Sequence, residues 1–495
     1  MGGSGITDAG GAGADPMEPA DEATSDTGSG RSAIRIAAVA ALGGFLFGYD
    51  SAVVNGAVDA IQRQFEIAAQ PLGFAVASAL LGAAVGAVSA GRVADRLGRL
   101  AVMKIAAFLF FLSAIGTGLA PNLTMLIIFR VVGGFGVGVA SVIAPAYIAE
   151  IAPARIRGRL GSLQQLAIVS GIFISLLVDF ILAKIAGGSG ETLWLGLEAW
   201  RWMFIAMVVP AVLYGTFSFT IPESPRYLIA THRIPEARRI LSKLLGEKGL
   251  DVKMDTIARS LASEKPPSWG DLLRTGGSRF SLLPIVWIGL GLSVFQQFVG
   301  INVIFYYSNV LWQSVGFSES DSFVFTVITA VINILTTLIA IATVDRVGRK
   351  PLLLIGSVGM TVTLATMSFI FGTADLNAAG DPVLTGAAGP VALVAANLFV
   401  VAFGMSWGPV VWVLLGEAFP NRIRASALAF AAGGQWIANW IITETFPSLK
   451  NLSLGLAYGF YAVCALLSFF FVWRWVRETK GRELEEIGSE AGQQR

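Results

Sequence analysis

Most side chains that could do chemistry in this 495-residue chain stand inside long apolar stretches of sequence. Asp50 and Arg130 are the acid and the base that stand out there. An ionised carboxylate is unfavourable in apolar surroundings, so Asp50 needs a cationic partner or must take up a proton. The Arg130 guanidinium stays charged and can hold the carboxylate ionised. The two residues therefore predict a proton-dependent switch, in which protonation of Asp50 weakens the pair and lets the surrounding helices rearrange.

This pair also has a simpler interpretation, a static ion pair that only holds two helices together. Two further acids, Asp179 and Glu444, stand nearer the outer ends of their apolar stretches. We interpret both of them as residues at the membrane interface.

Amide side chains form a second group of polar residues within the apolar stretches. An amide both donates and accepts hydrogen bonds, so it matches a hydroxyl-rich ligand in any local orientation. A single amide in such a place could equally bind a neighbouring helix. The number of amides, and the aromatic residues beside them, favour contact with a ligand. The amides are Gln165, Gln296, Gln297, Asn302, Asn333 and Gln435.

Composition limits the class of protein that can position these groups. Hydrophobic residues make up 55% of the chain and charged residues only 14%, whereas about one quarter of a typical soluble domain is charged. This excludes a soluble enzyme. The net charge of +2 argues against a nucleic-acid partner. Because Cys464 and His232 are the single cysteine and histidine, we expect no disulfide, no metal centre and no cofactor.

Twelve apolar stretches recur from Ile34 onward, each about 20 residues long, which is enough for a helix to cross the hydrocarbon core. The sequence therefore predicts an all-α membrane protein with twelve transmembrane helices. Gly300 interrupts the seventh stretch and predicts a helix break there, which we expect to act as a gating hinge. The predicted spans are 34–58, 71–91, 100–120, 123–148, 161–186, 200–221, 282–310, 322–344, 351–372, 389–419, 427–448 and 453–476.

Basic residues are concentrated in the connections after the second, fourth, eighth and tenth spans. The positive-inside rule therefore places both termini and the long central connection in the cytoplasm. The expected organisation is a disordered tail (1–33), a six-helix bundle (34–221), cytoplasmic linker helices (222–280), a second six-helix bundle (281–476) and a cytoplasmic tail (477–495).

The chain also repeats itself. The loop 91–99 is echoed by 345–350, the segment 150–157 by 417–424, and Gln165 by Gln435. Two halves with the same internal order are typical of transporters that have their site between the halves. Charged residues in the paired loops can link helix ends by charge-assisted bonds and so act as a gate, although they could also only fix the topology. They are Asp95, Arg99, Glu150 and Arg157, with Asp345, Arg349, Glu417 and Arg424 in the second half.

Several motifs in order make the sequence resemble a sugar porter of the major facilitator superfamily, with most similarity to bacterial glucose permeases. They lie at 48–53, 91–99, 130–134, 222–228, 296–302, 345–350, 408–412 and 478–482. The resemblance implies import of a hexose, D-glucose above all, by alternating access with proton symport through Asp50. It assigns the six amides to sugar contact, together with aromatic positions on or near the sugar. These are Phe47, Tyr306, Tyr307, Trp412 and Trp436.

Other functions stay open beside this one. An uncoupled sugar facilitator would use the same fold, and a membrane sugar sensor is a more remote alternative. A drug exporter fits the amides poorly, and a membrane-embedded enzyme would need clustered acids or a nucleophile–base pair. The expected partners are a monosaccharide, a proton and the lipid bilayer of the cell membrane, and the expected functional form is a monomer.

Overall fold

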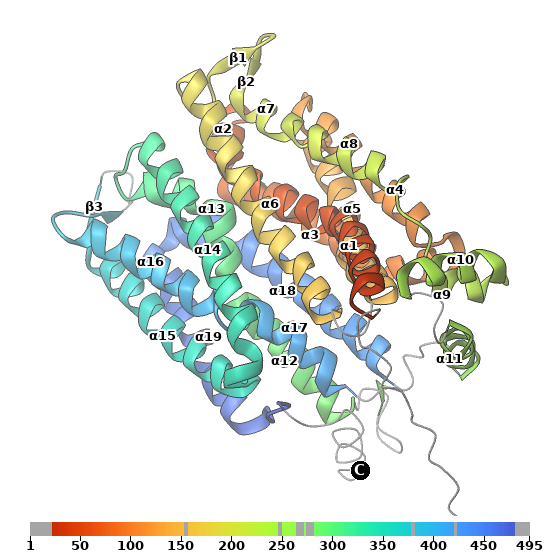
Figure 1. Ribbon diagram of the computed structural model, residues 1–495. Helices are drawn as coiled ribbons and strands as arrows, with labels where there is room; N and C mark the ends of the chain where they lie inside the picture. Colours follow the sequence, from red (N-terminus) through yellow and green to blue (C-terminus); the bar gives the residue numbers. More distant parts are fainter. Residues whose placement is uncertain are drawn as a thin grey trace, which may run out of the picture.

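The computed structural model describes residues 22–152, 157–245, 250–263, 272–273, 282–377, 382–419 and 423–480. Long helices that run side by side dominate this part of the chain (Figure 1). Eleven helical segments among the described residues are long and apolar enough to cross a membrane. The helical form follows from the apolar sequence, because a helix in lipid satisfies every backbone N–H and C=O group within its own segment.

The first half begins with α1 (Glu22–Ala52), which continues after a turn at Val53 as α2 (Val54–Gln64). The other helices of this half match the predicted spans closely. They are α3 (Ala69–Leu97), α4 (Arg99–Gly118), α5 (Leu123–Ile151), α6 (Arg157–Ala186), α7 (Ala199–Ala206) and α8 (Val208–Phe217).

The second half repeats this pattern with two interrupted spans. α12 (Pro284–Phe298) and α13 (Ile301–Ser314) form one of them, and α16 (Ala388–Gly404) and α17 (Trp407–Ala418) form the other. The remaining long helices of this half are α14 (Glu319–Val347), α15 (Arg349–Thr373), α18 (Arg424–Leu452) and α19 (Leu454–Trp475).

α18 is the predicted eleventh span and completes the set of twelve. It is 29 residues long, but it is not among the eleven segments apolar enough to be recognised by composition. Its sequence explains this, because Gln435, Asn439, Thr443 and Glu444 interrupt the apolar residues. Polar side chains within a spanning helix face a protein interior or a water-filled cavity rather than lipid.

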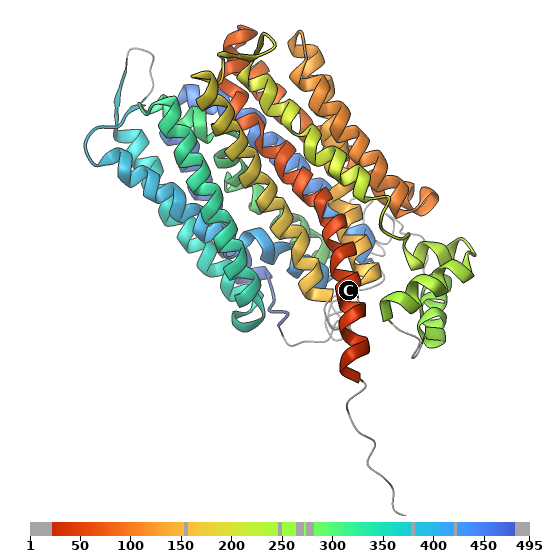
Figure 2. The ribbon, with the colours of Figure 1, turned by 45° about the horizontal axis from the view of Figure 1, so that its top comes forward.

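The two halves meet along two pairs of helices, and the pairs are equivalent to each other in the repeat. α3 packs against α18, and α6 packs against α14, so that the second span contacts the eleventh and the fifth contacts the eighth. Figure 2 shows α6 and α14 side by side. Polar groups on the faces along which these helices meet therefore lie between the halves.

Three short helices lie between the two halves in the described part of the sequence: α9 (Pro225–Ala230), α10 (Ile234–Leu245) and α11 (Leu250–Ser263). They lie outside the bundle, beside the end at which α1 begins (Figure 2). Leu228, Ile229 and Ala237 form a small separate core between them.

Two antiparallel hairpins were not predicted. One pairs β1 (Thr192–Trp194) with β2 (Leu197–Glu198), and the other pairs β3 (Asp375–Leu376) with β4 (Pro382–Val383). Leu195 and Gly196 connect the first pair with positive φ angles of 56° and 76°, the conformation of a tight two-residue turn. These strands are too short to leave a periodic pattern in the sequence.

Helix α1 begins at Glu22, twelve residues before the first predicted span at Ile34. The tail prediction for residues 1–21 lies outside the described residues, while residues 22–33 are helical rather than irregular. Extending an existing helix adds one hydrogen bond for each residue fixed and needs no new nucleation, so the apolar span can propagate the helix into the polar segment before it.

Candidate functional site

Asp50 and Arg130 lie together, as the sequence predicts. The Arg130 Nη1 atom is 3.8 Å from Asp50 Oδ2 and donates a hydrogen bond of 3.0 Å to the Asp50 backbone oxygen. Nη2 donates to the Val76 backbone oxygen at 3.3 Å. Both side chains are almost fully buried, with 1% of Asp50 and 2% of Arg130 exposed. Neither Asp50 carboxyl oxygen accepts a hydrogen bond within the described residues, so the carboxyl is held close to the guanidinium without being locked onto it.

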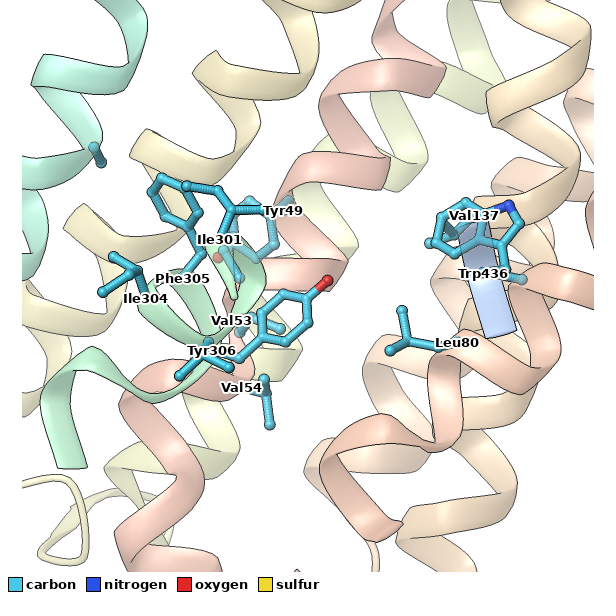
Figure 3. Packing of buried hydrophobic residues seen from close by; sticks show 14 of the residues in the cluster. Tyr49, Val53, Val54, Leu80, Val137, Ile301, Ile304, Phe305, Tyr306 and Trp436 are labelled. Carbon is cyan, nitrogen blue, oxygen red and sulfur yellow. The ribbon is translucent and has the colours of Figure 1, made fainter. Parts of the chain in front are cut away.

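A small cavity adjoins this pair and reaches the second half of the protein. Its lining includes Asp50, Ser51 and Arg130 from the first half and Tyr306 from α13. In Figure 3 the Tyr306 hydroxyl points away from α13, toward the side on which Leu80, Val137 and Trp436 lie. The predicted coupling residues are therefore in contact with the space between the halves.

The predicted amides of α12 and α13 form one connected group. Asn302 Nδ2 donates to Gln297 Oε1 at 2.5 Å, and Gln297 Nε2 lies 3.5 Å from Gln296 Oε1. Gln296 Nε2 in turn donates to the backbone oxygens of Trp407 and Gly408 at 2.7 and 3.1 Å. Gln296 thus anchors α12 to α17, a structural role, while Gln297 and Asn302 stand at the helix break beside it.

The remaining amides come from three other helices. Gln165 is half-buried on α6 and Asn333 is buried on α14. Gln435 is half-buried on α18, and its Oε1 atom has no hydrogen-bond partner within the described residues. An amide oxygen left without a partner is unfavourable unless a ligand or water supplies a donor.

The five predicted aromatic residues lie in different surroundings. Phe47 and Trp436 pack together across the halves, with 5.6 Å between ring centroids, and Tyr306 lines the cavity. Tyr307 instead donates to the Thr443 backbone oxygen at 2.9 Å, which fixes α13 to α18. Trp412 on α17 has 41% of its surface exposed.

The seventh span breaks at Gly300, as predicted. α12 ends at Phe298, and Gly300 has a φ angle of +82° in the left-handed region. A Cβ atom added to Gly300 would lie 2.7 Å from Cδ2 of Tyr461. Both the backbone angle and the close ring therefore require glycine at this position.

Asn55 joins the two halves at the end that the predicted topology places outside the cell, and the sequence analysis missed it. Its Nδ2 atom donates to the Phe305 backbone oxygen and to Ser308 Oγ, both at 2.9 Å, and its Oδ1 atom accepts from the Asn309 N–H at 3.2 Å. We call this contact between α2 and α13 the outer gate. Asn55 is fully buried there, so the structure has the halves closed at this end.

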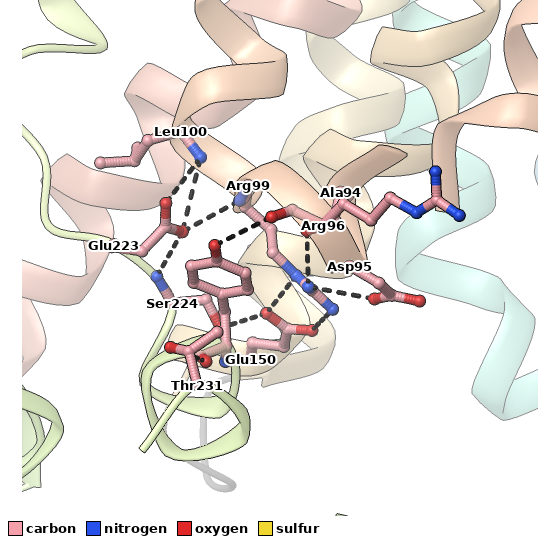
Figure 4. A network of polar contacts seen from close by, with 10 residues as sticks. Ala94, Asp95, Arg96, Arg99, Leu100, Glu150, Glu223, Ser224 and Thr231 are labelled. Atoms are coloured by element: carbon pink, nitrogen blue, oxygen red, sulfur yellow. Dashed lines mark hydrogen bonds and ion pairs between the residues drawn. The ribbon is translucent and has the colours of Figure 1, made fainter. Parts of the chain in front are cut away.

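The charged residues predicted as a gate form a cluster at the opposite end of the first half (Figure 4). Arg99 binds Glu150 through two parallel hydrogen bonds of 2.9 and 3.1 Å, and Asp95 lies 3.2 Å from the same guanidinium. Glu223 accepts from the backbone N–H of Arg99 at 3.0 Å, and the Ser224 hydroxyl donates to Glu150. Five side chains thus tie α3, α4 and α5 to the segment after α8.

The second half carries the equivalent cluster. Arg349 binds Glu417 through two hydrogen bonds of 2.7 and 3.1 Å, and the Thr479 hydroxyl donates to Glu417 at 2.6 Å. Glu478 accepts from the backbone N–H groups of Arg349 and Lys350 at 3.1 and 2.9 Å. The contacts described for each of the two clusters lie within one half. The side chains of Arg157, Asp345 and Arg424 lie outside the described residues.

Sequence reasoning missed the four residues that complete these clusters, Glu223, Ser224, Glu478 and Thr479. Their signal was present, because an acid followed by a hydroxyl residue comes directly after the sixth and the twelfth spans. The sequence analysis also misplaced Asp179, which it put at the membrane interface. Asp179 is instead fully buried on α6. Counting residues along a helix gives the depth of a side chain but not the face on which it lies.

Glu478 lies beyond the last spanning helix, and its titration follows from its contacts. Partial burial by itself would raise the pKa of the Glu478 carboxyl. The backbone N–H groups of Lys480, Arg349, Lys350 and Thr479 outweigh this effect and hold the pKa below its ordinary value. A lowered pKa means that the carboxylate stabilises the folded state above its ordinary pKa, and that this contribution disappears as the pH falls through the lowered value.

Replacing Glu478 with Gln is therefore expected to destabilise the protein at pH 7. The free energy of unfolding should fall by about 1–2 kcal/mol, or roughly 2–6 °C in melting temperature, because the Gln side chain presents an NH₂ group to backbone N–H donors. The difference from the parent protein should shrink as the pH is lowered below 4.5, the ordinary pKa of this carboxyl. Thermal unfolding in detergent at several pH values measures this difference in melting temperature. Glu236 forms an exposed pair with Arg233, so the control variant Glu236→Gln should leave the melting temperature nearly unchanged. Equal effects of the two variants would contradict this account.

Twelve spanning segments in two related halves, with a buried acid–base pair and amides between them, define a secondary transporter of the major facilitator fold. Comparison with known proteins agrees. The profile of the family described as "Sugar (and other) transporter" matches residues 36–491. The chain is 57% identical to the "Glucose transport protein" of Synechocystis sp., over 95% of this chain and all of that protein. It is 40% identical to the "D-xylose-proton symporter" of Escherichia coli K12, over 91% of this chain and 94% of that protein.

Solved structures give the same result. The inward-open conformation of the xylose transporter XylE from E. coli superposes with a TM-score of 0.77 at 37% identity, covering 92% of this chain and 99% of that one. XylE bound to 6-bromo-6-deoxy-D-glucose superposes with a TM-score of 0.76 at 38% identity, covering 93% and 99%. The chain belongs to the sugar transporter family of the major facilitator superfamily.

Proposed function

We propose that the protein imports D-glucose by alternating access, together with a proton. The buried Asp50–Arg130 pair, open on one side to the space between the halves, is the observation that carries the coupling. The substrate follows from the similarity to a glucose transport protein, and proton symport from the similarity to a xylose–proton symporter. The protein acts as a monomer in the cell membrane, with both termini in the cytoplasm.

The transport cycle uses the two ends of the molecule in turn. The outer gate is closed by Asn55 and α13, which leaves the cytoplasmic end as the route to the site. We assign sugar contact to Gln165, Gln297, Asn302, Asn333 and Gln435, with Phe47, Tyr306, Trp412 and Trp436 beside the sugar. When Asp50 takes up a proton, its attraction to Arg130 weakens, and α1 and α5 are free to shift against each other.

Uptake of radiolabelled D-glucose into proteoliposomes tests this proposal. With the lumen more alkaline than the outside, the sugar should accumulate above its external concentration, and unlabelled D-glucose should compete better than D-xylose. Equal uptake with and without the pH gradient would replace symport by facilitated diffusion. Absence of saturable uptake for either sugar would overturn sugar transport altogether.

Replacing Gln165 with Leu is expected to weaken sugar binding without preventing transport. Loss of an amide that bonds the ligand removes about 1–3 kcal/mol, which raises the half-saturating glucose concentration roughly 5- to 150-fold. The matched control is Gln164→Leu, because the Gln164 amide is buried against α1 at Gly44 instead. Glucose-dependence of uptake separates the two. A larger effect at Gln164 than at Gln165 would contradict the assignment.

A further inference from the structure

Asp179 is a second carboxyl group buried within the spanning helices, and the mechanism above does not use it. It lies on α6 with no exposed surface. Neither of its carboxyl oxygens has a hydrogen-bond partner within the described residues. An isolated ionised carboxylate in such surroundings is strongly unfavourable. In the conformation described, Asp179 is therefore held as the neutral acid.

The groups that face Asp179 come from α1 and α2. A Cβ atom added to Gly56 of α2 would lie 2.8 Å from the Asp179 Cβ and 3.0 Å from its Cγ, so only glycine allows this approach. The Gly56 backbone N–H also faces the carboxyl, without meeting the geometry of a hydrogen bond. Tyr49 of α1 also faces it, but the Tyr49 hydroxyl lies 3.4 Å from the Met203 backbone oxygen and donates to it.

Five sets of charged groups on the neighbouring elements have partners of their own. They are Asp59 with Arg63 on α2, Glu198 with Arg201 at the start of α7, Arg130 of α5 with Asp50 of α1, Glu319 of α14 with the Ser189 N–H, and Lys184 of α6 over the Phe180 ring. Asp179 therefore depends on water or a proton, rather than on a counter-ion, to balance its charge.

The position of Asp179 connects it to the outer gate. Asn55 of α2 bonds to α13, and the next residue of the same helix, Gly56, closes over the Asp179 carboxyl. When α2 holds α13, Asp179 is sealed from water. Water can hydrate an ionised Asp179 only when this end of the molecule opens and α2 moves away.

We propose that Asp179 is a second proton-binding site, separate from Asp50, which takes up a proton when the outer gate closes. The proposal rests on the alternating access described above but not on symport. Because one proton is bound in the closed state and released in the open state, each pH unit shifts the balance between open and closed states by up to about tenfold. Alkaline pH outside the cell thus favours the open outer gate, and acidic pH favours the closed one.

Accessibility of a cysteine in the outer gate tests the proposal. The full chain with Cys464→Ala and Ser308→Cys is reconstituted in proteoliposomes and labelled from outside with a membrane-impermeant maleimide between pH 5.5 and 8. Asn55 keeps its bonds to Phe305 and Asn309 in this variant. After correction for the reactivity of the thiol, with a cysteine peptide as the standard, the labelling rate should rise several-fold with pH.

The variants give the decisive comparison. Asp179→Asn should remove the pH dependence of the labelling rate. Asp59→Asn, in the pair with Arg63 on α2, and Asp50→Asn should keep it. Glucose counterflow shows that each protein is folded, and Asp179→Ser replaces Asp179→Asn if that variant fails this check. A pH dependence that survives both Asp179 variants, or labelling that is independent of pH in the parent, overturns the proposal. Loss of gradient-driven uptake in the parent would refute symport but leave this result unaffected.

Discussion

Replacing Asp50 with Asn is expected to abolish accumulation of glucose against its gradient while sugar exchange continues. With one proton per sugar, a gradient of one pH unit supports about a tenfold accumulation, and the variant should reach only equal concentrations on the two sides. The reason is geometric: Asp50 is the carboxyl group that faces both Arg130 and the cavity, and an amide in its place cannot exchange a proton. The accumulation ratio and counterflow in proteoliposomes measure the two activities separately.

The Asp50→Glu variant is the matched control, because it keeps a titratable group on the same helix. It should retain part of the accumulation that Asp50→Asn loses. Tenfold accumulation by Asp50→Asn would show that the pair with Arg130 is only a structural ion pair. Loss of counterflow as well as accumulation would assign Asp50 to sugar binding or to folding instead of coupling.

Replacing Gly300 with Ala should slow transport about tenfold or more. A residue with a side chain in the left-handed region is unfavourable by about 1–2 kcal/mol, and the new methyl group would also lie 2.7 Å from the Tyr461 ring. Either α13 must rotate or Tyr461 must move, and both displace Gln297 and Asn302 beside the break. Each 1.4 kcal/mol added to the barrier lowers the rate tenfold. Initial rates of counterflow, scaled to the amount of folded protein, measure the effect.

Gly316→Ala provides the control for backbone strain alone. Gly316 has a φ angle of +102°, and no atom lies within 4 Å of a Cβ added there. It should lower the melting temperature in a similar way but leave the transport rate close to that of the parent. An equal loss of rate in the two variants would mean that strain, and not the break at the site, limits transport. An unchanged rate in Gly300→Ala would refute the hinge.

The sequence predicted the fold well because each spanning helix needs a long apolar segment, and such segments are easily recognised. It also predicted the break at Gly300, since a glycine among amides has few other uses within a spanning helix. Where helices begin was harder, because α1 extends into a polar segment that has no apolar pattern. α18 was recognised as a span although its polar residues leave it outside the eleven segments that composition identifies.

The site was predicted in part, since residue types indicate chemistry but not direction. Asp50 and Arg130 were paired correctly because a buried acid needs a cation or a proton, and Arg130 was the base that stood out in the apolar stretches. Gln296 and Gln297 are neighbours in sequence, yet one bonds to the backbone of α17 and the other to Asn302. Asn55 and Asp179 gave no signal of their roles, because these depend on which helix face meets which neighbour.

The two charged clusters have a consequence for how the protein is made. Glu223 and Ser224 close the first cluster, so everything that ties α3, α4 and α5 together has been synthesised by residue 224. The first half can therefore lock its helix ends during translation, before the ribosome has produced any of the second half. Glu478 and Thr479 repeat this step for the second half. The two halves then dock as units in which the helix ends are already held in place. Insertion of the helices into the membrane and docking of the halves are thus separate steps.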